Sequence, residues 1–309
     1  MSYSRRSFLS LLPPATFLAH GWIAEAQSAD GRFSFAVLGG DPRRRGGARR
    51  FNQLVSELNA QSLAFIVHVG ESGARACSAD AYRERREALD QIQHAVIYTP
   101  GDGNWYDCSG RGASEASARL RDLRNALFNP AGKSLGGRSI DLETQGESAD
   151  FGEFAENTRY VHGKVIVIAI HVLRADDDGY AGGDSRRRAD AAIAWLYAAA
   201  QAGMRVGVQA AVIALHAGMS DRAGRDAYDG VYWALIEMAQ HAPIPLLVIH
   251  GGTEGFAADR PFRDPLTGSP IANLTRVRAL ASRNAGWIKV DVNTTAEQPF
   301  RFEAKLASR

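Results

Sequence analysis

Residues 94–108 read HAVIYTPGDGNWYDC, in which an apolar run ends in a turn of proline, glycine and aspartate, and Trp105, Tyr106 and Cys108 soon follow. Short runs of branched and aromatic residues are typical of buried β-strands, and glycine and proline are typical of the turns that end them. This stretch therefore predicts a strand whose carboxyl end opens into a turn that presents side chains.

The same pattern recurs along the chain, between segments that carry apolar residues at helical spacing. Continuous apolar runs predict strands buried on both faces, and the alternation of strands with helices predicts an α/β domain. The polar, Gly-rich segment 131–157 is interpreted as a long surface excursion. The predicted strands cover residues 32–38, 62–69, 94–100, 164–173, 209–216, 243–250 and 287–292, and the predicted helices cover 48–61, 81–93, 116–128, 186–203 and 227–240.

The charge balance argues against two classes of partner. Lys and Arg together number 36 and Asp and Glu 34, which gives a formal net charge of only +2. A balance this close provides no electrostatic drive toward nucleic acid or a membrane surface, so we expect neither as a partner. The composition does not indicate an oligomeric state.

The first residues resemble a bacterial twin-arginine export signal. Arg5 and Arg6 precede an apolar run, and a small-residue site follows with cleavage expected after Ala26. Two prolines interrupt the run, which is shorter than the ~20 residues that span a bilayer, so no stable membrane insertion is expected after cleavage. We expect a signal peptide at 1–26 and one mature domain at 27–309 that works in the periplasm or outside the cell.

Cys77 and Cys108 are the two cysteines of the chain, and both lie in the mature part. An oxidising compartment would let them form a disulfide, which would stabilise the fold by about 3 kcal/mol by restricting the unfolded chain. A metal site or a catalytic thiol is the alternative, although no third cysteine exists to complete a metal cage.

Candidate functional residues lie in the loops that follow the predicted strands, because these loops form the crevice of open α/β sheets. Each loop begins with glycine or with a histidine close to glycine. Glycine lets the backbone approach a ligand closely, although it can also simply make a sharp turn. The loops read GGDPRRR (39–45), GESGARAC (70–77), GDGNWYDC (101–108), HAGMSDR (216–222) and HGGTEGF (250–256).

The order and spacing of these loops resemble the calcineurin-like metallophosphoesterase superfamily. The resemblance is closer to an exported bacterial subfamily whose loops read roughly GD-x-P-Y, H-x-GD, TPGDNEW-x-DC and HGD-x-H, and it covers nearly the whole mature chain. It implies an α/β fold that is a four-layer αββα sandwich, two mixed β-sheets flanked by helices. It also implies a two-metal centre at the strand ends that hydrolyses phosphate esters.

Most of the metal ligands that this resemblance implies are replaced here. A two-metal centre needs carboxylate, imidazole or amide donors to neutralise and fix two cations, and glycine offers no side-chain donor. The degenerate ligand positions carry Gly40, Gly103 and Gly252, while the bridging Asp falls on Glu71, the acidic neighbour of the Asn ligand on Asn104 and the final His on Glu254.

Our first hypothesis is therefore a pseudoenzyme, an exported and degenerate phosphoesterase homologue that acts as a binding or accessory protein without a cofactor. In a specific form of it, Arg43, Arg44 and Arg45 bind a phosphate-bearing or other anionic small molecule, because guanidinium groups recognise phosphate without a cation. A solvated basic loop is the simpler interpretation of this run.

The alternative hypothesis is an enzyme with a remodelled centre that holds one or two divalent metal ions, such as Mn, Fe or Zn, and activates water. Asn104 and His216 are then the candidates for a catalytic role. A Ser/His/Asp hydrolase and a nucleotide-binding protein are not indicated, because the nucleophile-elbow and phosphate-loop motifs are absent. The candidate metal ligands are Asp41, Glu71, His216, His250 and Glu254, with Asp102 at a further strand end.

Overall fold

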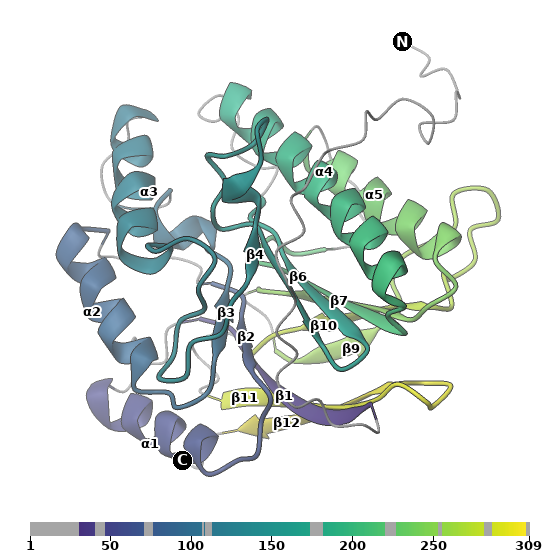
Figure 1. Cartoon of the computed structure of the whole chain (residues 1–309), viewed down its shortest axis with the longest axis horizontal. Helices are drawn as coiled ribbons and strands as arrows, with labels where there is room; N and C mark the ends of the chain where they lie inside the picture. The colour runs from purple at the N-terminus through teal and green to yellow at the C-terminus, as the bar shows by residue number, and fades with distance from the viewer. Residues whose placement is uncertain are drawn as a thin grey trace.

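The computed structural model describes most of the chain beyond the predicted signal peptide. In it, two β-sheets pack face to face, with helices on both outer sides (Figure 1). The predicted signal peptide lies outside the described residues. These residues are 31–40, 47–70, 77–106, 108, 113–173, 182–219, 227–252, 255–280 and 286–306.

The first sheet has five strands in the order β12-β11-β1-β2-β3. It is mixed, because β1 runs parallel to β2 and antiparallel to β11. Its strands are β1 (Arg32–Leu38), β2 (Ile66–His68), β3 (Val96–Tyr98), β11 (Gly286–Asn293) and β12 (Phe300–Leu306).

The second sheet has seven strands in the order β4-β5-β6-β7-β8-β10-β9. Its central strands β6, β7, β8 and β10 are parallel, and β4, β5 and β9 pair antiparallel at its two edges. Its strands are β4 (Glu143–Thr144), β5 (Thr158–His162), β6 (Val165–Ala169), β7 (Ala210–Leu215), β8 (Leu246–His250), β9 (Ala257–Asp259) and β10 (Leu274–Arg278).

The helices form the two outer layers (Figure 1). Three cover the first sheet and two cover the second. The first group is α1 (Gly47–Asn59), α2 (Ala79–Asp90) and α3 (Ala113–Leu127), the second is α4 (Gly182–Val206) and α5 (Ala227–His241), and two short 3-10 helices, η3 (Asp102–Asn104) and η4 (Gln145–Glu147), lie in loops.

Alternate side chains along each central strand pack into different layers of the fold. In β1, Phe35 and Val37 pack between the two sheets, whereas Ala36 and Leu38 pack under α1, α2 and α3. Successive side chains of a strand point to opposite faces, so each central strand contributes to two cores. The predicted four-layer αββα sandwich is confirmed.

The prediction that segment 131–157 is a surface excursion holds only in part, because exposed and buried residues alternate along the segment. Leu135 forms a bridge with Val96 at the edge of the first sheet, and Glu156 and Asn157 are completely buried. The polar composition of the segment suggested exposure, but several of its polar side chains form hydrogen bonds inside the protein.

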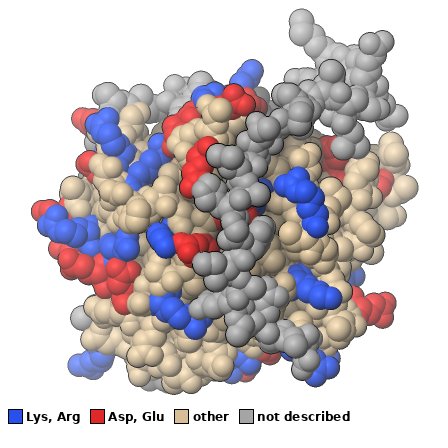
Figure 2. All heavy atoms as spheres, viewed as in Figure 1, with Lys and Arg blue, Asp and Glu red and all other residues tan. Residues whose placement is uncertain are grey.

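No helix in the described ranges is long and apolar enough to cross a bilayer. On the face of the molecule in Figure 2, basic and acidic side chains of the described residues are interspersed. This face therefore has no extended field of one sign, as the balanced composition predicts.

Candidate functional site

The carboxyl ends of the parallel strands are joined by close backbone contacts. The N–H of Gly40, after β1, donates to the carbonyl oxygen of Gly70, after β2, over 2.9 Å. Gly70 has φ of 63°, and a Cβ added to it would lie 2.3 Å from the nitrogen of Gly101, after β3. Only glycine fits at position 70, because the next turn passes directly over it.

The turn after β3 is built around Asn104, which is completely buried. Its side-chain oxygen accepts hydrogen bonds from the N–H of Gly101 (2.6 Å) and the hydroxyl of Tyr98 (3.0 Å). The Tyr82 hydroxyl donates to the backbone carbonyl oxygen of Asn104 (2.8 Å). Burial raises the pKa of Tyr82 to about 12, so this hydroxyl stays protonated. These bonds give Asn104 a structural role in the turn, and its catalytic role stays a prediction.

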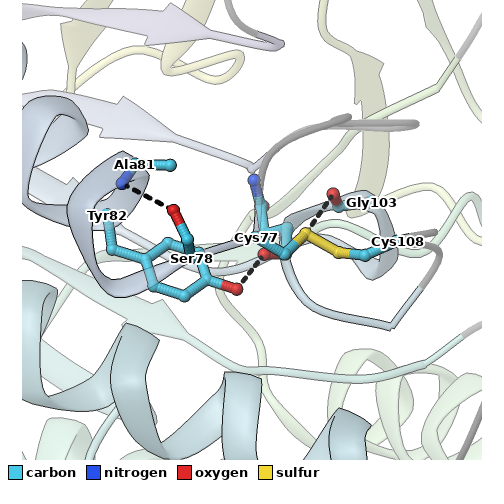
Figure 3. The surroundings of a disulfide bond; sticks show 7 residues. Cys77, Ser78, Ala81, Tyr82, Gly103 and Cys108 are labelled. Atoms are coloured by element: carbon cyan, nitrogen blue, oxygen red, sulfur yellow. Dashed lines mark hydrogen bonds between the residues drawn. A yellow bond between two sulfur atoms is a disulfide. The ribbon is translucent and has the colours of Figure 1, made fainter. Parts of the chain in front are cut away.

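A disulfide bond joins this turn to the start of α2 (Figure 3). The Cα atoms of Cys77 and Cys108 are 6.2 Å apart, and the predicted pairing is confirmed. The sulfur of Cys77 lies 4.0 Å from the carbonyl oxygen of Gly103, so the crosslink packs against a degenerate ligand position. Ser78 follows at once and caps α2 by accepting from the N–H of Ala81 (3.2 Å).

His216, after β7, connects the second sheet to the first. Its Nδ1–H donates to the carbonyl oxygen of Val69 over 2.6 Å. A carbonyl oxygen can only accept, so Nδ1 carries a proton, and in the neutral tautomer Nε2 is the unprotonated nitrogen. Histidines that bind metal through one nitrogen usually hold the other in such a bond, so this tautomer suits a ligand.

His250, at the end of β8, is a second buried imidazole. Its Nδ1–H donates to the carbonyl oxygen of Gly251 (2.5 Å), and its Nε2 has no hydrogen-bond partner in the described part of the chain. Burial, helped by the charges of Arg276 and Arg278, lowers the pKa of His250 to about 4. The ring is therefore neutral at pH 7.

The strand-end glycines and histidines that the sequence singled out come together only in part. The N–H of Gly251 donates to the carbonyl oxygen of His216 (3.1 Å), which brings the ends of β7 and β8 together. A Cβ on Gly252 would lie 3.2 Å from Cδ of Arg278, so an arginine stem packs at that degenerate ligand position. Six candidates lie outside the described residues: Asp41, Arg43, Arg44, Arg45, Glu71 and Glu254.

The described donors do not fit a two-metal centre. Gly40, Gly103 and Gly252 supply no side-chain atom, and the oxygen of Asn104 already accepts two hydrogen bonds within its own turn. Among the described residues, no group of three His, Cys, Asp or Glu side chains is placed to hold a metal ion. Within the described ranges, His216 and His250 each hold Nδ1 in a bond to a backbone carbonyl oxygen, a geometry that suits a metal ligand.

Sequence reasoning missed a buried polar cluster beside the β3 turn. His171, after β6, is completely buried, and its Nδ1 lies 2.9 Å from Oε1 of Glu156. Arg124 of α3 donates to both oxygens of Glu156 (2.8 and 2.6 Å), and Arg188 of α4 donates to Oε1 (3.1 Å). The indole N–H of Trp105 donates to Nε2 of His171 (3.1 Å).

The His171 and Glu156 pair has the composition of a catalytic dyad but not its exposure. The second ring nitrogen of His171, Nε2, accepts a hydrogen bond from the Trp105 indole, and both side chains are completely buried. The sequence signal for His171 was weaker than that for His216 and His250, because His171 lies inside its apolar run and is followed by Val172 and Leu173. Glu156 and Arg188 gave no such signal.

The fold has known structural neighbours. The sequence matches no protein-family model and no curated protein. The structure is similar to that of PhoD, with a TM-score of 0.56 and 10% identity over 89% of this chain and 68% of that chain. It is also similar to a dimetal phosphatase from Danio rerio, with a TM-score of 0.51 and 12% identity over 90% of this chain and 97% of that chain. The chain thus has a metallophosphoesterase-like fold.

Proposed function

We propose that this chain is an exported, non-catalytic relative of the metallophosphoesterases that binds an anionic small molecule instead of hydrolysing a phosphoester. The proposal combines the fold with the loss of metal-binding side chains at the strand ends.

The observation that carries the proposal is the backbone at Gly40. Its φ of 84° lies in the left-handed region, which glycine adopts freely and aspartate only occasionally. The resemblance places the first metal-binding aspartate at this position. The local backbone is therefore adapted to glycine, and Gly103 and Gly252 repeat the loss at two further ligand positions.

A cationic site without metal is supported at the end of β1. The sequence between β1 and α1 contains Arg43, Arg44 and Arg45, and α1 begins at Gly47 and has no acidic residue in its first turn. A helix amino terminus carries partial positive charge, and arginine binds phosphate in a bidentate manner. A phosphate-bearing or carboxylate ligand is the class that this combination favours.

Export is supported by two features that are independent of each other. The twin arginines and the apolar run have the pattern of an export signal, and the Cys77–Cys108 disulfide is compatible with an oxidising compartment. We assign the mature domain to the periplasm or the extracellular space. Amino-terminal sequencing of the secreted protein tests this, and we expect Gln27 as the first residue.

Metal content and turnover test the lack of catalysis directly. The purified protein is analysed for metals before and after incubation with Mn, Zn and Fe, and is assayed on p-nitrophenyl phosphate and bis(p-nitrophenyl) phosphate. We expect no tightly held pair of metals and no turnover above buffer. Two equivalents of metal together with turnover contradict the proposal.

Anion binding is tested by calorimetry with inorganic phosphate as the probe. Replacing Arg43, Arg44 and Arg45 together by Ala should weaken binding at least tenfold, because each charge-assisted contact contributes roughly 1.5–3 kcal/mol. The matched control replaces three exposed arginines elsewhere, Arg83, Arg205 and Arg301, and should leave binding unchanged. Equal affinities of both triple variants and the parent contradict this ligand site.

A metal-dependent hydrolase with a remodelled centre is the second candidate, and the tautomer of His216 favours it. Its Nε2 lone pair could ligate one divalent ion with help from Asp41, Glu71 or Glu254. One bound equivalent of Mn, Zn or Fe that is lost in His216→Ala but retained in His241→Ala, an exposed control, would favour this candidate over the first.

A further inference from the structure

Trp105 and His171 meet where the loops of the two sheets touch. Trp105 belongs to the turn after β3 in the first sheet, and His171 follows β6 in the second. Both are buried, with 2% and 0% of their surface exposed. The indole N–H donates to Nε2 of His171 (3.1 Å), and the hydroxyl of nearby Thr99 donates to the carbonyl oxygen of Ile170 (2.8 Å).

The indole determines where the imidazole carries its proton. An indole N–H can only donate, so Nε2 of His171 must be unprotonated and accept. The ring proton therefore sits on Nδ1, where Oε1 of Glu156 accepts it at 2.9 Å. A second proton can be added only at Nε2, the atom that holds Trp105.

The charged groups around His171 oppose that second proton. They are Glu156, which precedes β5, Arg124 from α3 and Arg188 from α4. Nη1 of Arg188 lies 3.0 Å from Nδ1 of the ring, and because Nδ1 carries the proton, the Arg188 N–H is donated to Oε1 of Glu156 (3.1 Å) and not to the ring. One carboxylate thus already faces two guanidinium groups, and a protonated imidazole would add a third positive charge in a buried place.

We propose that the Trp105–His171 hydrogen bond is an acid-sensitive latch on the turn after β3. Protonation of His171 puts an N–H opposite the indole N–H, so the protonated ring and the bond exclude each other. Two donors facing each other repel, and the turn that carries Gly103 and Asn104 detaches from the second sheet. At neutral pH the ring is neutral and the latch is closed.

The titration range agrees with this geometry. Burial and the charge of Arg188 lower the pKa of His171 to about 4. Each pH unit below this value raises the ratio of released to latched molecules about tenfold. The inference needs no bound ligand, so it stands or falls separately from the proposed function.

The indole N–H of Trp105 is the reporter for the test. In the purified, 15N-labelled protein, hydrogen exchange of the indole N–H groups is followed by NMR from pH 7 to pH 3.5 and corrected for intrinsic exchange. We expect the protection of Trp105 to fall about fourfold across this range, because pH 3.5 lies about half a unit below the pKa of His171. Trp195 and Trp287, which are equally buried, should keep their protection and serve as internal controls. Loss of protection at all three together, or retention at Trp105, overturns the proposal.

Two variants separate the latch from a purely structural contact. In His171→Gln the side-chain oxygen still accepts from the indole but does not titrate, so Trp105 should stay protected down to pH 3.5. If that variant does not fold, Trp105→Phe supplies the second measurement, with exchange of the Asn104 backbone N–H as its reporter. This N–H should lose protection with acid in the parent protein and show a pH-independent, lower protection in Trp105→Phe. Equal acid profiles in parent and variant overturn the proposal.

Discussion

The Nδ1 atom of His216 lies 2.6 Å from the carbonyl oxygen of Val69, and this bond joins the strand ends of the two sheets. It orients the ring in the tautomer of a metal ligand, at a site where Gly40, Gly103 and Gly252 supply no side-chain donor and the side-chain oxygen of Asn104 is already engaged. In a non-catalytic binding protein this contact only stabilises the fold. In a metal-dependent hydrolase it would also position the His216 ring for a metal ion.

Replacing His216 by Ala should destabilise the protein. The carbonyl oxygen of Val69 would lose its buried donor, and leaving such a group unsatisfied costs about 1–3 kcal/mol. His216→Asn retains an N–H donor and should recover a large part of the loss. Urea unfolding followed by circular dichroism measures both variants, and equal destabilisation by Ala and Asn would contradict the role of the bond.

Glu156→Gln should be among the most destabilising single changes. Its carboxylate neutralises Arg124 and Arg188 in the interior, and breaking a buried pair typically costs about 3–5 kcal/mol. Burial alone would raise the pKa of Glu156, but the hydrogen bond from His171 and the charge of Arg124 hold it below its ordinary value.

A matched control lies three residues away. Glu153 pairs with Arg187 at the surface, where the two side chains are 43% and 53% exposed. Such pairs contribute about 0–1 kcal/mol, so Glu153→Gln should change the free energy of unfolding little. A loss in Glu156→Gln no larger than in Glu153→Gln would show that the buried cluster does not stabilise the fold as argued.

Loss of the disulfide should cost about 3–4 kcal/mol, because the crosslink closes a loop across 31 positions of sequence. The double variant Cys77→Ala, Cys108→Ala is compared with the oxidised parent by urea unfolding. The reduced parent should match the variant. Non-reducing mass spectrometry checks the bond itself, and two free thiols in the native protein would contradict the pairing.

Most of the strands that the sequence predicted are buried on both faces. β6, β7 and β8 read as unbroken apolar runs because one face packs against a sheet and the other against helices. β12 was missed, since it is an edge strand whose Arg301 and Glu303 are exposed and break the apolar pattern. β5 and β10 were missed for a related reason, as each carries an arginine inside the strand.

The site was predictable only where a residue follows an apolar run. His216 and His250 had that signal, and the structure places both at strand ends. The burial of Glu156 could not be inferred, because its partners Arg124 and Arg188 each lie 32 positions away in the sequence. From the sequence alone, a charged residue in a polar segment is predicted to be exposed, because charged side chains are rarely buried without a partner. The partners of Glu156 become its neighbours only in the folded structure.

Stability should fall on mild acidification. Burial lowers the pKa of His171 and His250 to about 4 from an ordinary value of 6.5. Between these values the unfolded chain takes up protons that the folded chain does not, so stability is complete above pH 6.5 and is lost as the pH falls toward 4. Each histidine contributes about 3 kcal/mol over the full window. Glu156 does not interfere, because its contribution is lost only below its ordinary pKa of 4.5.

Urea unfolding at pH 7.0, 6.0 and 5.0 measures this dependence. We expect the free energy of unfolding to decline at each step in the parent, and to decline about half as steeply in His250→Gln. His241→Gln, which removes an exposed histidine at the end of α5, should follow the parent curve. A slope that His250→Gln leaves unchanged would mean that this ring takes up its proton equally well in the folded chain.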